Sequence, residues 1–375
     1  MTKTFARTDT STVGRWWWTV DRWILTAVSI LIAMGILLNL AAGPPAADRI
    51  GAETYHFVRR QLMFLPIAAF TMFAVSLLPA LWIRRVSAIG FVCALALLLL
   101  TVLIGNEVNG ARRWLQLGTF SFQPSEFVKP FFIVIAAWMF AEYRLKENFP
   151  GGSIALGFLV LVVALLLSQP DVGMTLVVVA VWCAQFFVAG LPMFWVISIS
   201  VLGLCGLVGA YFVFSHVASR VDRFLDPSSG DTYQISQAMR AFQNGGLVGR
   251  GPGEGRIKEA LPDAHTDFIF AVAGEEFGVF LCLAMVAVFA FIVLRAIVKA
   301  LQDESLFVLL AVGGLSIQFG LQAIINMASS LHMMPTKGMT LPFISYGGSS
   351  IVSLSIGMGM ILALTRKQRN TARLI

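Results

Sequence analysis

The chain has 375 residues, of which 58% are hydrophobic and 13% are charged, against roughly 25% charged residues in soluble domains. This composition excludes a globular enzyme with a single anchor and leaves no long polar block for a large soluble domain. The formal net charge is +7, but basic and aromatic residues are not interleaved as in nucleic-acid-binding proteins. We therefore expect these charges to meet membrane lipid and no nucleic acid.

Ten apolar segments are long enough to be transmembrane helices, since about 20 apolar residues cross the hydrocarbon core. The predicted fold is an all-α polytopic membrane protein with ten transmembrane helices in one membrane domain, 23–365. A cytoplasmic N-terminal segment, 1–22, precedes this domain, and a basic cytoplasmic tail, 366–375, follows it. The predicted spans are 23–43, 61–80, 87–105, 125–142, 153–169, 172–190, 193–214, 268–298, 306–330 and 346–365.

The orientation follows from the number of spans and the positions of Lys and Arg. An even number of spans puts both termini on one side of the membrane. Outside the long connection 215–267, most Lys and Arg lie on the side of the termini, which predicts cytoplasmic termini. The long connection is then a large extracytoplasmic loop between the seventh and eighth spans.

The connection before the fourth span reads NGARRWLQLGTFSFQPSEFVKP, residues 109–130. Glu126 and Lys129 are three residues apart and therefore share one helix face. One interpretation is that Arg113 and Lys129 are snorkelling cations at a span end. The other is an anion site in which both bind phosphate.

Further along, SQPDVGMT places Asp171 at the start of the sixth span. There a carboxylate binds free amide groups and stabilises the helix dipole. In the long loop, DTYQISQAMRAF, residues 231–242, predicts an amphipathic helix. The following GGLVGRGPGEG, residues 245–255, matches no phosphate-binding motif. Its glycines predict a mobile or tightly turned segment with positive φ.

The stretch LPDAHTDFIF, residues 261–270, leads into the eighth span. Asp267 is explained either as a helix cap or as a reactive carboxylate; Thr266 is a second candidate cap, and His265 is an expected orienting neighbour. The apolar run that follows exceeds one bilayer crossing at 1.5 Å per residue. Either its first turns project above the hydrocarbon, or the helix kinks at Gly274 or Gly278.

Before the last span, MPTKGMTLPFISYGGSS, residues 334–350, places a cation in a Pro- and Gly-rich connection. Cations and carboxylates of several connections then share one extracytoplasmic mouth. Cations bind phosphate, and a carboxylate near cations and hydrocarbon suits a general base. The expected ligand has an anionic head and a long lipid tail. The residues are Arg60, Arg113, Lys129, Lys337, Asp267, Glu259 and Asp171.

These motifs resemble, in the same order, the signature segments of the SEDS family (shape, elongation, division and sporulation), from about residue 20 to residue 370. Within the family, LPDAHTDFIF and GRGPGEG most resemble the branch that acts in cell division. The elongation branch typically has Gln at the position of Ala264.

The resemblance implies a ten-span glycosyltransferase of the bacterial cytoplasmic membrane that polymerises lipid II into β-1,4 glycan strands at the outer face. It implies action at the septum with a class B penicillin-binding protein and other divisome proteins, and a donor strand linked to undecaprenyl pyrophosphate. Asp267 corresponds to the family's essential aspartate, and Glu259 to a second sensitive acid. A divalent cation, Mg²⁺ or Mn²⁺, is an expected cofactor. The expected substrate-binding residues are Arg60, Arg113, Lys129, Lys337, Glu126, Asp171, His265 and Thr266.

Three other functions fit parts of the pattern. An elongation-type polymerase differs at few positions. A lipid II flippase also needs many spans and charged residues along a lipid-sized path, but here the charges concentrate on one side, which favours a surface reaction. A purely structural scaffold leaves the clustered acids and cations without a role.

Overall fold

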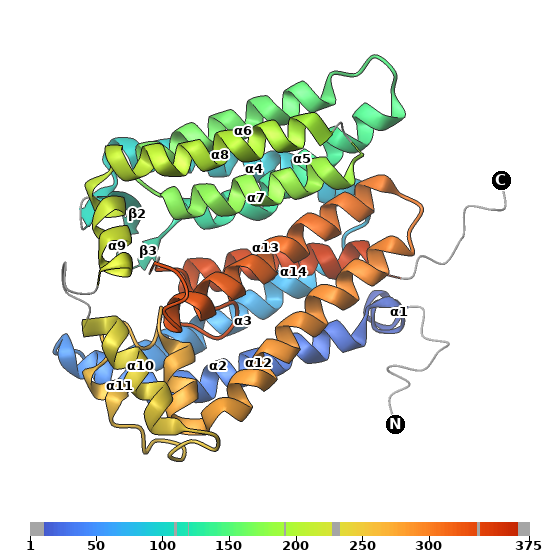
Figure 1. Cartoon of the computed structure of the whole chain (residues 1–375). Helices are drawn as coiled ribbons and strands as arrows, with labels where there is room; N and C mark the ends of the chain where they lie inside the picture. Colours follow the sequence, from blue (N-terminus) through green and yellow to red (C-terminus); the bar gives the residue numbers. More distant parts are fainter. Residues whose placement is uncertain are drawn as a thin grey trace.

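The computed structural model describes residues 11–108, 111–118, 120–190, 193–226, 233–335 and 338–366. Within these ranges the chain is a bundle of long helices (Figure 1). A helix occupies each of the ten segments predicted as spans. These helices are α2 (Arg22–Arg49), α3 (His56–Ser76), α4 (Ala80–Ile104), α5 (Pro124–Leu145), α6 (Gly151–Ser168), α7 (Val172–Val188), α8 (Met193–Val213), α12 (Ile269–Leu301), α13 (Leu306–Ser330) and α14 (Gly348–Leu364).

Seven of the fourteen helices that the structure describes have the length and apolarity of membrane spans. The helices α2, α3, α4, α5, α6, α12 and α13 are long and apolar enough to cross a membrane. The helices α7 and α14 and the Val201–Val213 part of α8 are apolar but shorter. The chain is therefore a polytopic helical membrane protein, and a count of ten crossings stays a prediction.

The centre of the bundle is formed by α5, α13 and α14, which are covered by the other helices (Figure 1). Of the most apolar 18 residues of α5, 83% are buried, against 28% for α3 and α4. Small residues allow close packing between α14 and α3, because a Cβ at Gly359 would lie 2.8 Å from the carbonyl oxygen of Met72.

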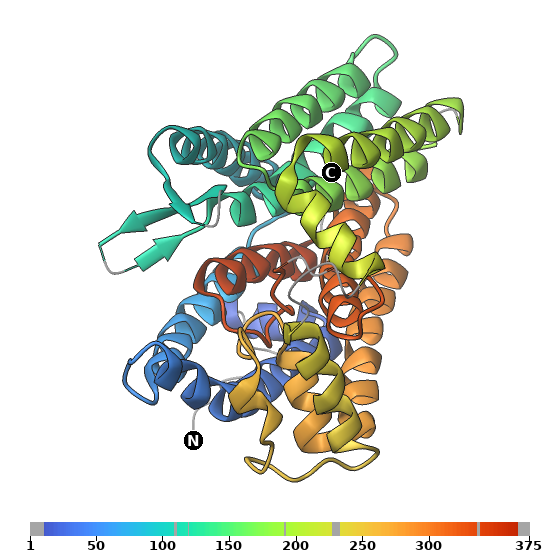
Figure 2. The same cartoon turned by 60° about the vertical axis from the view of Figure 1, so that its left-hand side comes forward.

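The predicted helical fold class is confirmed, and one short segment adds strands to it. Residues between α4 and α5 form a three-stranded antiparallel sheet of β1 (Asn106–Val108), β2 (Ala111–Leu117) and β3 (Phe120–Phe122). The sheet projects from the bundle beside α4 (Figure 2). Backbone pairing within the segment satisfies its N–H and C=O groups where no helix continues.

The long connection between α8 and α12 contains three helices, α9 (Ser215–Leu225), α10 (Tyr233–Gly245) and α11 (Ile257–Ala260). The predicted amphipathic helix is confirmed as α10, which packs against α12. These helices lie at the same end of the bundle as the sheet, and α1 (Thr12–Thr19) lies at the opposite end (Figure 1). The helix α1 was not predicted.

The helix α12 is broken at Gly278, one of the two predicted positions, where φ is 72° and ψ is −170°. The glycine-rich strap, residues 245–255, lies along this break. The Gly251 N–H donates to the carbonyl oxygen of Glu276 at 2.9 Å. A Cβ at Gly249 would lie 2.2 Å from the same oxygen, and φ is positive at both strap glycines. The tight turn is confirmed, and glycine is required because the strap touches the backbone of α12.

Candidate active site

Asp267 is not the N-cap residue of α12. The first residue of α12 is Ile269, and its N-cap residue is Phe268, which makes no side-chain cap. The Thr266 hydroxyl donates to the carbonyl oxygen of Asp263 at 3.2 Å. The prediction of Thr266 as the cap is therefore wrong, because the helix starts later than the polar motif.

The backbone of Asp267 is held from two sides. Its N–H donates to the Asp263 carbonyl at 3.0 Å. Its carbonyl accepts from the Asn326 amide at 3.0 Å and from the Ser330 hydroxyl at 3.4 Å, both from α13. Gly338 lies beside the carboxylate, since a Cβ there would be 3.3 Å from Asp267 Oδ2. Asp267 therefore lies where the start of α12, the end of α13 and the connection to α14 meet.

The ring of His265 packs between aromatic side chains. Its centroid lies 4.1 Å from that of Phe57 and 5.5 Å from that of Tyr346. Burial lowers the pKa of His265 from 6.5 to about 4, because the charged imidazolium loses its hydration. The ring is thus neutral near pH 7. Its backbone oxygen accepts from the Tyr346 N–H at 2.9 Å, which joins the 261–268 segment to the connection before α14.

Lys129 is buried in the bundle and does not snorkel. Its side chain is 1% exposed, and Nζ lies 2.9 Å from Glu126 Oε2 and 3.0 Å from Gln322 Oε1. The snorkelling interpretation is wrong here because Lys129 is in the second turn of the most enclosed helix, α5. Gln322 in turn donates to the Thr340 carbonyl at 3.1 Å. The Lys129 ammonium is therefore connected to the same segment that borders Asp267.

Arg113 and Asp171 lie together at the α6–α7 connection. The guanidinium of Arg113, on β2, donates to the Pro170 carbonyl at 2.5 Å and to the Gln169 carbonyl at 3.4 Å. Its Nε lies 3.9 Å from Asp171 Oδ2. Asp171 also accepts from the Met174 N–H at 3.1 Å, so its predicted role as the cap of α7 is confirmed.

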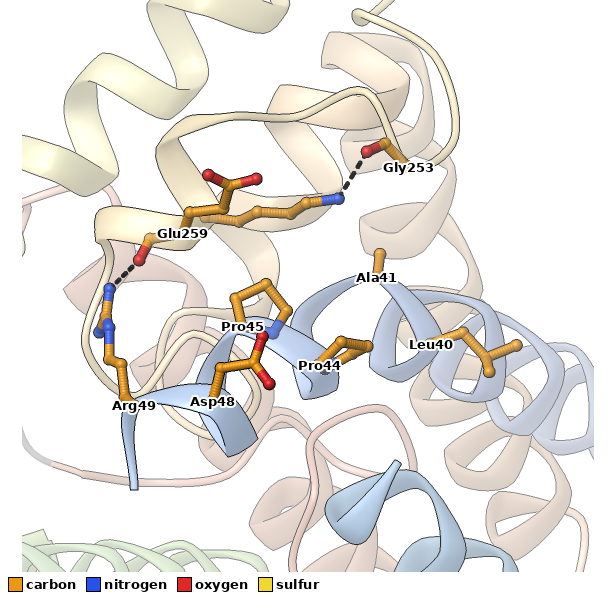
Figure 3. A pocket seen from close by; sticks show the side chains of 9 residues that line it. Leu40, Ala41, Pro44, Pro45, Asp48, Arg49, Gly253 and Glu259 are labelled. Atoms are coloured by element: carbon orange, nitrogen blue, oxygen red, sulfur yellow. Dashed lines mark hydrogen bonds between the residues drawn. The ribbon is translucent and has the colours of Figure 1, made fainter. Parts of the chain in front are cut away.

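Glu259 is exposed on α11 at the edge of a separate cavity of about 630 Å³ (Figure 3). Its carbonyl oxygen accepts from the Arg49 guanidinium at the end of α2. Arg60 is half-buried on α3, and Lys337 lies outside the described residues. Asp267 does not line this cavity, so the two acids face different surroundings. The other lining residues are Leu40, Ala41, Pro44, Pro45, Asp48, Arg49, Gly253 and Lys258.

No group of three or more His, Cys, Asp or Glu side chains among the described residues forms a metal-binding cluster. A metal cage made of protein ligands alone is therefore absent from that part of the chain. Mg²⁺ is commonly bound by one or two carboxylates together with substrate phosphates. Asp267 fits that mode of binding.

Comparison with known proteins identifies the family. The family model described as "Cell cycle protein", for FtsW, RodA and SpoVE, matches residues 21–370. The chain belongs to this family. The SEDS resemblance of the five motifs is thereby confirmed.

Relatives and solved structures of the SEDS family match over nearly the whole chain. A protein of Caulobacter vibrioides, "Probable peptidoglycan glycosyltransferase FtsW", is 46% identical over 98% of this chain and 94% of its own. A protein of the same name from Escherichia coli O157:H7 is 34% identical over 93% and 86%.

Two solved SEDS structures are 26% identical to this chain. One belongs to a study of "polymerization and crosslinking by a peptidoglycan synthase complex"; its TM-score is 0.76, and the match covers 92% of this chain and 97% of that one. The other is RodA of Thermus thermophilus, with a TM-score of 0.70 and coverage of 94% and 99%.

A row of buried polar residues on α13 of this SEDS protein was not predicted from the sequence. Gln322, Asn326 and Ser330 follow one another at intervals of four residues and are each at most 1% exposed. Four-residue spacing places them on one helix face. Buried polar residues in an apolar helix usually have bonding partners, and this pattern was a readable signal of a polar network.

Proposed function

We propose that this protein is a peptidoglycan glycosyltransferase that polymerises lipid II at the outer face of the cytoplasmic membrane during septal wall synthesis. Family membership and the names of the matching relatives support the reaction class. The observation that carries the catalytic assignment is Asp267. Its backbone is fixed from two sides, and Asp267 is not the N-cap residue of α12.

In the proposed reaction, Asp267 takes the proton of the acceptor's 4-hydroxyl as that oxygen attacks the anomeric carbon of the donor strand. The bond from the anomeric carbon to the diphosphate oxygen breaks, and undecaprenyl pyrophosphate leaves with the bonding electrons. One displacement inverts the α-linked donor to a β-1,4 product. General-base assistance of this kind contributes about 10²- to 10⁴-fold.

Cationic groups would stabilise the diphosphate as charge develops on it. We assign this role to Arg60, Arg113, Lys129 and Lys337, with Lys129 oriented by Glu126. Asp171, His265 and Thr266 complete the proposed site, and Glu259 is proposed as a second functional acid at the separate cavity beside α2. Among these, Asp171 and Thr266 act through local structure, since one caps α7 and the other bonds to a nearby carbonyl.

We also propose that Asp267 and the substrate diphosphate would together hold a divalent cation, Mg²⁺ or Mn²⁺. Such an ion supplies charge neutralisation for the leaving group. The partner that we propose is a class B penicillin-binding protein within the divisome, because a matched solved structure belongs to work on a peptidoglycan synthase complex. Both termini are proposed to be cytoplasmic.

The test is polymerisation of purified lipid II in detergent by the full chain with its penicillin-binding partner. We expect glycan strands from the wild type and a loss of at least about 100-fold in Asp267→Asn. Detergent removes the second compartment that a flippase needs, so strand formation excludes transport as the only activity.

The matched control for this test is Asp263→Asn. Asp263 lies four residues earlier, is exposed and has a φ of 53°, which asparagine tolerates. The Asp263→Asn variant should retain activity, because in the part of the chain that the structure describes Asp263 is bonded through its backbone oxygen. Activity in Asp267→Asn equal to that of the control would refute Asp267 as the base.

A further inference from the structure

The amide of Asn326 joins two segments at the reactive carboxylate. Its Nδ2 donates to the Asp267 carbonyl at 3.0 Å and to the Met339 carbonyl at 2.6 Å. Asn326 is 1% exposed, in the middle of the polar row of α13. The two acceptors are 72 residues apart in the chain and belong to the segments before α12 and before α14.

We propose that Asn326 is a positioning residue for Asp267, and that the α13 row sets the separation between the Asp267 carboxylate and the Lys129 ammonium. This inference rests on the proposed function. Asn326 touches no reacting atom in this role; it acts through the backbone of Asp267. Ser330, one turn later, donates to the same carbonyl at 3.4 Å.

The chemistry of the amide explains why asparagine suits this position. Both partners of Nδ2 are carbonyl oxygens, so both of its N–H bonds are used and the amide cannot be flipped without losing them. Its Oδ1 is buried without a hydrogen-bond partner among the described residues. An ionised aspartate here would set a carboxylate against two carbonyls, and leucine would supply no donor.

Gln322, one turn earlier on the same face, makes the equivalent connection for the cation. Its Oε1 accepts from Lys129 Nζ at 3.0 Å. Its Nε2 donates to the Thr340 carbonyl at 3.1 Å and lies 3.4 Å from the Ser350 hydroxyl.

Residues 338–340 are therefore bound to the row at two points, with Gly338 next to the Asp267 carboxylate. One rigid helix face thus fixes both the proposed base and a proposed diphosphate cation. Fixing both groups on one helix reduces their relative motion. A misplacement of about 1 Å in such an arrangement can cost about 100-fold in rate.

The experiment compares Asn326→Leu, Asn326→Asp and the control Ser329→Ala in the full complex, with lipid II polymerisation normalised to folded protein by size-exclusion chromatography. Ser329 is on the same helix, and its hydroxyl donates to the Asn326 carbonyl. We expect kcat per folded molecule to fall about 10- to 100-fold in Asn326→Leu with KM for lipid II within about twofold. Ser329→Ala should retain wild-type kcat.

The Asn326→Asp variant still tests the inference if the Asn326→Leu variant does not fold. A protonated aspartic acid recovers one donor, so activity relative to wild type should rise as pH falls from 8 to 6. A purely structural role predicts wild-type kcat per folded molecule. The inference would be overturned by wild-type kcat in the variants or by a change in KM alone. It would also be overturned if the activity of Asn326→Asp relative to wild type did not change with pH.

The inference and the proposed function fail differently. Loss of strands in Asp267→Asn with full activity in the Asn326 variants overturns only the positioning role. A wild-type complex that forms no strands overturns the proposed function and the inference with it.

Discussion

Replacing Glu275 by alanine should release the segment that precedes LPDAHTDFIF from α12. The Glu275 carboxylate is fully buried and accepts four hydrogen bonds. One comes from the Asn244 amide at 2.9 Å. The other three come from backbone N–H groups at the start of α11, at 2.9, 2.8 and 3.1 Å. The three backbone donors are Arg256, Ile257 and Lys258.

The loss of local stability in Glu275→Ala can be worked out from these four hydrogen bonds. An intramolecular hydrogen bond has a net value of about 1 kcal/mol, so their loss costs about 4 kcal/mol of local stability. Since 1.4 kcal/mol is a factor of ten, the open population of this segment should rise about 1000-fold. The change is local, because α12 retains its apolar packing in the bundle.

Limited trypsin digestion in detergent measures this opening. Cleavage after Arg256 requires the bond between its N–H and Glu275 to break, so the initial rate tracks the open population when opening is fast. The control is Glu254→Ala, an exposed acid of the same strap, which should leave the rate unchanged. A rate for Glu275→Ala within about threefold of that control refutes the role of the carboxylate.

Two further changes test other contacts. Gly249→Ala should destabilise the strap much more than Gly253→Ala, because a Cβ at Gly249 meets the Glu276 carbonyl at 2.2 Å whereas Gly253 has open space at a similar positive φ; equal thermal unfolding temperatures would contradict this. The lowered pKa of His265, about 4 in the folded protein against 6.5, means that the unfolded chain binds an extra proton between these values. Stability should therefore fall as pH drops from 6.5 towards 4, by about 2 kcal/mol at pH 5. His265→Phe, which keeps the packing on Phe57, should remove that part of the pH dependence, and an unchanged pH dependence of thermal unfolding would show that the imidazole is not its source.

The local sequence was sufficient to predict the structure where a short stretch contains all of the interacting groups. Apolar runs of span length became helices because an apolar environment leaves backbone groups no other partners. Asp171 caps α7 as predicted, since the donor that it binds is three residues away. The break at Gly278 followed from glycine and from the length of the run.

Prediction from the local sequence failed where the role of a residue depended on the exact start of a helix or on how deeply that helix is buried. Thr266 was a plausible cap, but α12 begins only at Ile269. Lys129 reads as a span-end cation, yet α5 is enclosed by other helices and its ammonium pairs with Glu126. The strands before α5 were not predicted because pairing between short segments leaves a weak signal in sequence.

The sequence by itself determined the class of the protein, the positions of its span-length apolar helices and the identity of Asp267 as the residue of interest, because composition, apolar length and motif order are properties of the chain alone. Only the tertiary structure showed that Asp267 is not the N-cap residue of α12 and which residues hold its backbone in place. Its carbonyl is bound by Asn326 from α13, and Lys129 is joined through Gln322 to the same helix face. Such contacts link residues 59 to 193 positions apart, and a local pattern holds no information on which distant donors will meet.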